Sequence, residues 1–220
     1  MRTMKVVAAA LAGIALQSAP AAAQIPGLEV SLVPKVGFYS PATDLQTAAD
    51  AAGEIVDDRG GSLALGLALD LGVPLSPLNV RVGFDYVTAS EFTYADDSDP
   101  MTAFETTGEQ TMLAIAGDVV LRPIPKLLIV QPYLLAGAGV KRYDFSFPEA
   151  AESNDADEAF PDDATDFTVH AGIGLDVGLG PIALVAELSD YVSWYEAEGA
   201  DGSEMQHDLF LMAGLRVGLF

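Results

Sequence analysis

Apolar residues alternate with small or polar residues along several segments of this chain. In the clearest segment, one face carries Leu63, Leu65, Leu67, Leu69, Leu71 and Val73, and the other carries Ala64, Gly66, Ala68, Asp70 and Gly72. A period of two is the period of a β-strand, whereas a helix would distribute the same leucines around its circumference. The segment 62–73 is therefore predicted to be a strand with one apolar face.

The same alternation predicts eight strands, at 29–40, 62–73, 79–92, 109–122, 127–143, 166–179, 182–195 and 205–220. Short connections at 74–78, 123–126 and 180–181 alternate with long ones at 41–61, 93–108, 144–165 and 196–204. This pattern is typical of an all-β, antiparallel up-and-down transmembrane β-barrel, with short periplasmic turns and long external loops. Three irregularities are expected: Pro132 should cause a bulge or a gap in pairing, and Gly117 and Asp190 fall on apolar faces.

The polar faces decide between a membrane barrel and a soluble barrel or sandwich. They are rich in glycine and alanine and carry charges at Lys35, Asp70, Arg81, Asp85, Asp118, Arg122, Lys141, Asp176, Glu187 and Arg216, with Glu29 at the chain's first strand. An eight-stranded barrel is just wide enough for side chains to fill it, so these residues are predicted to form a paired polar network in the lumen. The leucine faces would then contact lipid, and a soluble barrel would have the opposite arrangement.

The N-terminal segment has the features of a secretory signal peptide. Arg2 and Lys5 precede an apolar run from Val6 to Leu16, which is too short to span a membrane as a helix. Ala21-Ala22-Ala23 offers a cleavage site, so residues 1–23 are predicted to be removed and residues 24–220 to form the barrel domain. The chain has no cysteine, so disulfides cannot stabilise it.

The charge is strongly negative, with 10 Lys and Arg against 32 Asp and Glu and a net charge of −22, although half of the residues are hydrophobic. Nucleic acid is therefore not expected as a partner. Many acids lie in the long connections, and weak candidates for a metal site are Asp155, Asp157, Glu158, Asp162 and Asp163. Carboxylates suit hard cations, but no EF-hand spacing is present, and a solvated acidic loop explains the same residues.

Aromatic residues gather toward the long-loop ends of the strands, where an interfacial girdle would lie. They are Phe38, Tyr39, Tyr86, Phe92, Tyr143, Phe167, Tyr191, Trp194 and Tyr195. Ordinary strand aromatics would explain some of them equally well.

The chain resembles the small eight-stranded outer-membrane barrels of the OmpA/OmpX type and the wider porin-like group. The resemblance rests on the signal segment, the strand and loop pattern, the segment Gln131–Gly139 and the terminal Phe220. It implies the outer membrane of a Gram-negative-type bacterium. It also implies an assembly signal, read by the outer-membrane assembly machinery, in Leu215, Val217, Leu219 and Phe220, although Phe220 has the parity of the polar face.

Three functions fit such a barrel. We expect a structural or interaction role, in which acidic external loops contact lipopolysaccharide, cations or other surfaces and the protein is a monomer among outer-membrane lipids. A narrow pore or small-molecule carrier is the alternative. A lipid-modifying enzyme is a further alternative and would use His170 or His207 with Ser189 or Ser193, but no spacing selects these residues. No catalytic residue and no cofactor is predicted.

Overall fold

The computed structural model describes residues 27–43, 55–73, 76–96, 104–123, 129–146, 164–179, 181–195 and 204–219. Their regular structure consists of the strands β1 (Glu29–Pro41), β2 (Ile55–Arg59), β3 (Ser62–Gly72), β4 (Leu78–Asp96), β5 (Phe104–Leu121), β6 (Val130–Ser146), β7 (Ala164–Leu179), β8 (Ile182–Tyr195) and β9 (Glu204–Gly218). Within these ranges, no helix has the length and apolar character needed to cross a membrane.

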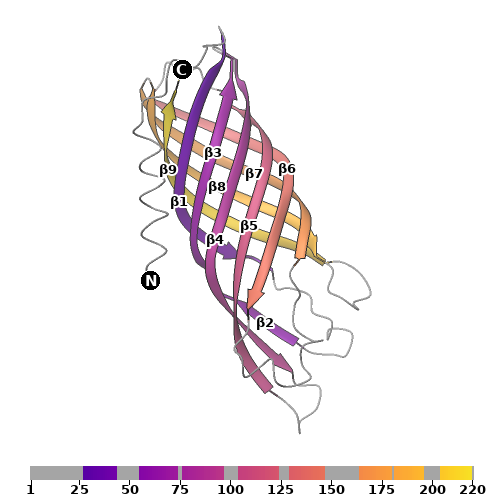
Figure 1. The fold of residues 1–220 in the computed structure, drawn as a ribbon. Helices are drawn as coiled ribbons and strands as arrows, with labels where there is room; N and C mark the ends of the chain where they lie inside the picture. Colours follow the sequence, from indigo (N-terminus) through magenta and orange to yellow (C-terminus); the bar gives the residue numbers. More distant parts are fainter. Residues whose placement is uncertain are drawn as a thin grey trace.

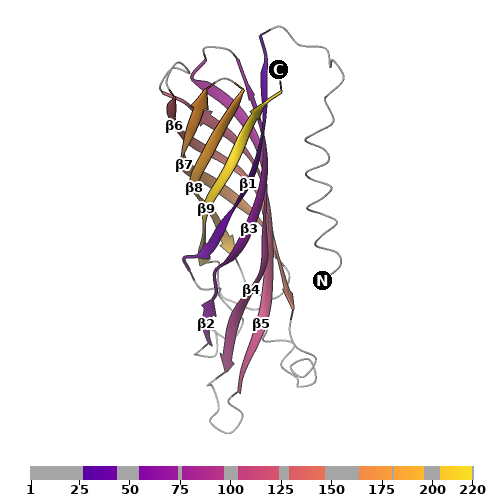
Figure 2. The same ribbon diagram turned by 90° about the vertical axis from the view of Figure 1, so that its left-hand side faces the viewer.

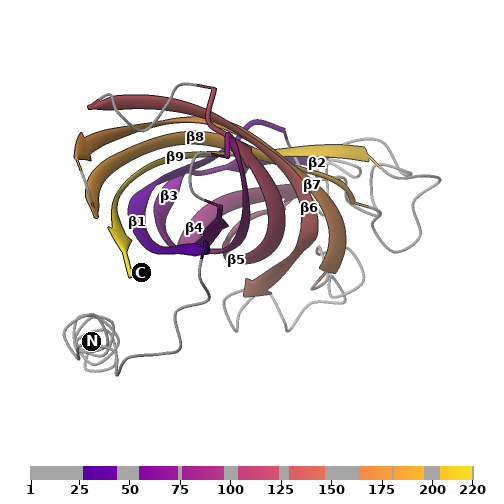
Figure 3. The same ribbon diagram turned by 90° about the horizontal axis from the view of Figure 1, so that it is seen from above.

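The strands form one closed antiparallel wall (Figures 1 and 3). The order around it is β4-β3-β1-β9-β8-β7-β6-β5, and the pairing of β4 with β5 closes the barrel. In the described part of the chain, the short strand β2 pairs only with the outer part of β4, beyond the end of β3, so the wall itself has eight strands. The predicted eight-stranded up-and-down barrel is therefore confirmed, and β2 is an addition to it.

Large apolar side chains cover the outside of the barrel and charged side chains fill its inside. Leu184 and Leu211 are 64% and 62% exposed, whereas Arg81 and Lys141, which point inward from their strands, are each 1% exposed. A soluble barrel would bury the leucines and expose the charges. The arrangement is the one that lipid requires, because closure also satisfies the backbone hydrogen bonds that water cannot reach.

The strands β4 and β5 are longer than predicted. They stay paired up to Asp96 and Phe104, so most of the predicted loop 93–108 is strand. β2 likewise occupies part of the predicted loop 41–61. Figure 2 shows β2, β4 and β5 extending past the other strands at the end opposite the C-terminus. A register shift between Val87 and Ser90 separates this extension from the barrel wall, as a bulge does where a strand changes direction.

Of the bulge or gap in pairing expected at Pro132, the structure shows a gap on one side and no bulge. β6 pairs with β7 through Pro132 and Leu175 without a shift in register, and its pairing with β5 begins only at Leu134. Pro132 thus lies where β6 is not paired on the β5 side. A missing N–H is tolerated at such an edge position.

The aromatic girdle is smaller than the sequence pattern indicated. Phe38, Phe167 and Trp194 face outward and are 54%, 61% and 49% exposed, and Tyr86 is 37% exposed. Four of the other aromatics in that group instead lie inside the barrel and are at most 2% exposed: Tyr39, Phe92, Tyr143 and Tyr191. Strand parity separates the two sets, since Tyr39 has the parity of the inward Lys35 and Phe38 does not.

Candidate functional site: the charged interior

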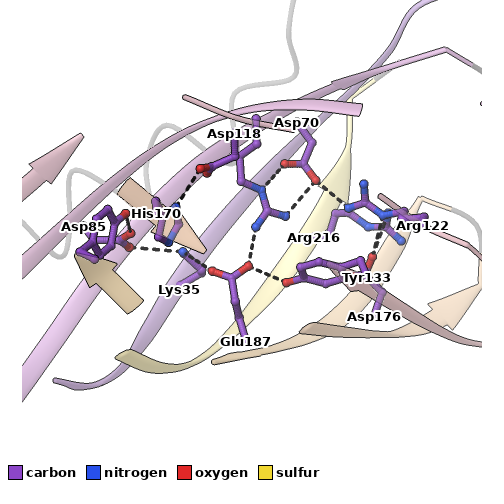
Figure 4. A network of polar contacts seen from close by, with 12 residues as sticks. Lys35, Asp70, Asp85, Asp118, Arg122, Tyr133, His170, Asp176, Glu187 and Arg216 are labelled. Atoms are coloured by element: carbon purple, nitrogen blue, oxygen red, sulfur yellow. Dashed lines mark hydrogen bonds and ion pairs between the residues drawn. The ribbon is translucent and has the colours of Figure 1, made fainter. Parts of the chain in front are cut away.

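A chain of ion pairs fills the half of the barrel nearer the short turns (Figure 4). Lys35 on β1 contacts Glu187 on β8 at 2.8 Å and Asp85 on β4 at 3.3 Å. Arg81 on β4 binds the other oxygen of Glu187 and forms two hydrogen bonds with Asp70 on β3, at 2.6 and 3.1 Å. These contacts join four strands across the interior.

The chain of ion pairs continues toward the turns. Asp70 also accepts a hydrogen bond from Arg122 at 2.9 Å, and Asp176 on β7 contacts both Arg122 at 3.3 Å and Arg216 on β9 at 3.2 Å. Tyr133 on β6 donates a hydrogen bond to Glu187 at 2.6 Å. We refer to this group as the turn-side cluster; its members are Lys35, Asp70, Arg81, Asp85, Arg122, Tyr133, Asp176, Glu187 and Arg216.

A second group, the Asp208 cluster, lies toward the long loops and comprises Tyr39, Arg59, Lys141, Tyr143 and Asp208. The carboxylate of Asp208 on β9 accepts hydrogen bonds from Tyr39 at 2.7 Å and Tyr143 at 2.5 Å. It also contacts Lys141 on β6 and Arg59 at the end of β2. The side chains of Asp208 and Lys141 are fully enclosed. Of the ten predicted lumen residues, Lys141 alone belongs to this cluster.

Sequence reasoning missed Arg59 and Asp208. Arg59 lies in the segment 41–61, which the sequence pattern predicts to be a long connection. Asp208 shares the parity of Arg216 along β9, and this signal alone would have placed it in the lumen. Arg59 also donates to the Thr43 carbonyl at 3.0 Å and to Gln110 at 3.2 Å, so one side chain joins β2 to the residues after β1 and to β5.

His170 and Asp118 form a buried pair in the middle of the barrel. The Nδ1 atom of His170 lies 2.9 Å from Asp118, and its ring stacks on that of Tyr191 with centroids 4.0 Å apart. Tyr191 in turn donates to Asp85 at 2.7 Å. Among the described residues, Nε2 of His170 and one oxygen of Asp118 are buried without a hydrogen-bond partner.

The two candidate serines of the enzyme alternative lie on β8. Both Ser189 and Ser193 face inward and are buried. His207 on β9 contacts Asp190 through Nδ1 at 2.7 Å. In the described part of the chain, no hydrogen bond links either histidine to a serine. The geometry there therefore gives neither serine an adjacent base.

The buried charges nearly balance. The buried cations are Lys35, Arg59, Arg81, Arg122 and Lys141, and the buried carboxylates are Asp70, Asp85, Asp118, Asp176, Glu187 and Asp208. Arg216, with a side chain 14% exposed, supplies a sixth cation. Charges removed from water are tolerated when they are paired and hydrogen-bonded. Among the described residues, these buried charges therefore contribute almost nothing to the net charge of −22.

Several predicted residues fall outside the described ranges: the signal segment 1–23, the loop carboxylates Asp155, Asp157, Glu158, Asp162 and Asp163, and Phe220. Of the predicted assembly signal, Leu215 and Leu219 face outward and are 39% and 48% exposed, and Val217 shares their parity on β9. Among the described residues, no cluster of three or more histidines and acids has the geometry to hold a metal ion.

Comparison with known proteins places this barrel in a family. A family model described as "Outer membrane protein beta-barrel domain" matches residues 7–202. The chain belongs to the outer membrane protein beta-barrel domain family. This membership implies that the barrel resides in an outer membrane. No curated protein sequence matches the chain.

Solved structures give the same fold at low sequence identity. The outer membrane protein OprG from Pseudomonas aeruginosa is 11% identical with a TM-score of 0.57, over 86% of this chain and 95% of OprG. A major outer membrane protein from Thermus thermophilus is 15% identical with a TM-score of 0.50, over 87% and 98% of the two chains. Both likenesses support the outer-membrane barrel fold and, at this identity, the fold alone.

Proposed function

We propose that this outer-membrane barrel has a structural or interaction role and that its interior is a plug. The observation that carries the proposal is the burial of the paired interior charges: Arg81, Asp85 and Glu187 are each 1% exposed. A water-filled channel passing these residues would leave their side chains accessible to water. Large, mutually paired side chains across a narrow barrel are the usual filling at eight strands.

The surface available for interaction is then the external end, whose connections are acidic. The connection between β6 and β7 alone carries Glu149, Glu152, Asp155, Asp157, Glu158, Asp162 and Asp163. Arg142 is the only outward-facing Lys or Arg on the described strands, and it contacts Asp144 at 2.7 Å. Direct pairing with anionic lipopolysaccharide is therefore weak, and we propose that divalent cations bridge the loop carboxylates to its phosphates.

Lipopolysaccharide binding in the presence of Mg²⁺ or a chelator tests this role. The protein should be reconstituted in vesicles and titrated with lipopolysaccharide at constant ionic strength, with Na⁺ replacing Mg²⁺ in the control. Binding should weaken at least about tenfold when Mg²⁺ is removed, as expected for the loss of a few charge-assisted contacts. A variant in which the carboxylates of residues 155–163 are changed to amides should bind lipopolysaccharide equally weakly with and without Mg²⁺. Binding that ignores Mg²⁺ would overturn the cation-bridged contact.

A narrow pore is the second candidate, and specific atoms favour it. Near the middle and the loop end of the interior, Asp118, His170, Ser193 and Gln206 each have a buried polar atom without a partner among the described residues. Such atoms usually bind ordered water. A continuous row of water molecules through the interior would form a narrow pore. Planar-bilayer conductance separates the two functions: the plug predicts no steady conductance from the folded protein, and a pore predicts one.

A further inference from the structure

Asp190 breaks the pattern of the lipid-facing wall. On β8 it shares its face with Leu184 and Leu188, which are 64% and 46% exposed, and with Trp194, which is 49% exposed. A carboxylate on this face costs free energy, because lipid cannot solvate it. A titratable residue retained there therefore calls for a partner.

The depth of Asp190 follows from the aromatic girdle. Asp190 lies four residues from Trp194 along β8, and its cross-strand neighbour Ala171 lies four residues from Phe167 along β7. On β1 the girdle residue Phe38 lies on the other side of the same row, two residues from Ser40, which pairs with Leu209 opposite Asp190. Asp190 thus lies between the girdle aromatics, at the level where lipid headgroups give way to acyl chains.

His207 on β9 is the protein partner of this carboxylate. Its Nδ1 atom lies 2.7 Å from Asp190, and the two side chains are 31% and 25% exposed. Asp190 and His207 are diagonal neighbours on adjacent strands, since Asp190 pairs with Leu209 and His207 pairs with Val192. With Nδ1 held by the carboxylate, Nε2 is the ring nitrogen left for another molecule.

The surroundings indicate which chemistry the pair can bind. Ser40 on β1 is exposed on the same wall and pairs with Leu209, so it lies diagonal to His207, with Leu209 between Ser40 and Asp190. The outward faces of β7, β8, β9 and β1 carry no Lys or Arg in the described ranges. Without a cationic residue, a phosphate is a poor fit. A neutral group that both donates and accepts hydrogen bonds fits His207, Asp190 and Ser40.

We propose that Asp190, His207 and Ser40 form a binding site on the outer wall for the linkage region of an outer-leaflet lipid, recognised through amide and hydroxyl groups at the base of its acyl chains. Because the Asp190 carboxylate accepts from Nδ1–H, Nε2 of a neutral His207 ring is an acceptor. An amide N–H or a hydroxyl from the lipid would donate to it. An ester-linked lipid, which offers only acceptors there, would not.

The test compares two lipids with the same phosphocholine headgroup. Sphingomyelin carries an amide and a hydroxyl in its linkage region, and phosphatidylcholine carries esters. The folded protein, in detergent with equal amounts of both lipids, should retain sphingomyelin about five- to tenfold over phosphatidylcholine in native mass spectrometry, as expected for one or two hydrogen bonds. Equal retention of the two lipids would overturn the proposal.

Variants locate the site. D190L/H207L should abolish the preference, and S40L should reduce it, while R142L/D144L, which removes an outward ion pair elsewhere on the wall, should leave it unchanged. The heat-dependent gel shift verifies that each variant folds; if D190L/H207L does not, S40L still decides. A preference that survives both variants overturns the assignment. A dimer that D190L/H207L converts to a monomer would also overturn it, because the pair would then contact a second copy of the chain.

Discussion

Tyr133 on β6 reaches over β7 to donate a hydrogen bond to Glu187 on β8, with 2.6 Å between the phenol and carboxylate oxygens. The residue between them in the lateral row is Gly174, which pairs with Tyr133 on one side and Glu187 on the other. A Cβ at Gly174 would overlap the Tyr133 ring. The glycine thus provides the space that lets two side chains meet across an intervening strand.

The same arrangement occurs twice more inside the barrel. Gly66 lies between Lys35 and Asp85, and Gly137 lies between Asp118 and His170. In both cases an added Cβ would overlap the carboxylate that takes part in the pair. The interior glycines therefore determine which ion pairs can form, in addition to leaving room for them.

Replacing Gly174 with alanine should destabilise the barrel by about 1–3 kcal/mol, the usual cost of an overpacked site. The Tyr133 ring cannot move away freely, because its hydroxyl is bound and Arg81 and Arg122 lie 5.3 Å from its centre. Urea unfolding in lipid vesicles measures the change. Gly83→Ala is the matched control, since Gly83 also faces the interior but its added Cβ would meet no atom within 4 Å. Equal effects of the two substitutions would contradict this account.

Removing the two partners of the Tyr133–Glu187 hydrogen bond should have unequal effects. Tyr133→Phe should cost about 1.5–3 kcal/mol, because a hydrogen bond to a charged group is lost while Glu187 keeps Lys35 and Arg81. Glu187→Leu should cost about 3–5 kcal/mol, because it leaves two buried cations with fewer partners. The same unfolding assay gives both values. A smaller loss for Glu187→Leu than for Tyr133→Phe would show that Glu187 is not the centre of the cluster.

The Asp208 cluster makes a local prediction about β2. Arg59 joins β2 to Asp208, Thr43 and Gln110, so Arg59→Ala should speed amide hydrogen exchange in Ile55–Arg59 and in the paired stretch of β4 from Phe92 to Asp96. Exchange in β7 and β8 should not change, because those strands do not pair with β2. Arg142→Ala, an exposed arginine on β6, is the control. If the amide protection of β2 is the same in Arg59→Ala as in the wild type, strand pairing alone holds β2 in place.

The sequence pattern predicted the barrel because alternation is a local signal and eight apolar faces repeat it. Parity also places Asp208 and Tyr143 inside, whereas the position of Tyr143 near a strand end suggested an interfacial girdle. What parity could not give is the choice of partners. Lys141 faces Asp208 rather than the turn-side cluster because of strand tilt and register, which depend on the whole closed wall. The extension formed by β2, β4 and β5 was missed for a different reason: its residues lack a continuous apolar face.

The last prediction concerns the plug. Arg81 and Glu187 are large and paired, and together they span the interior between β4 and β8. The double substitution R81A/E187A removes the volume of both side chains. It also removes both charges of the pair, so neither Arg81 nor Glu187 is left without the other. The wild-type protein should give no steady current in planar bilayers, and the double variant should give a small one that is selective for one sign of ion. The outward pair variant R142A/D144A should be as silent as the wild type, because it changes equal charge on the opposite face of the wall. Steady conductance in the wild type would overturn the plug and make the narrow pore the leading function. A double variant without conductance would show that the interior is closed at another level. The Asp208 cluster would then be the next group to substitute.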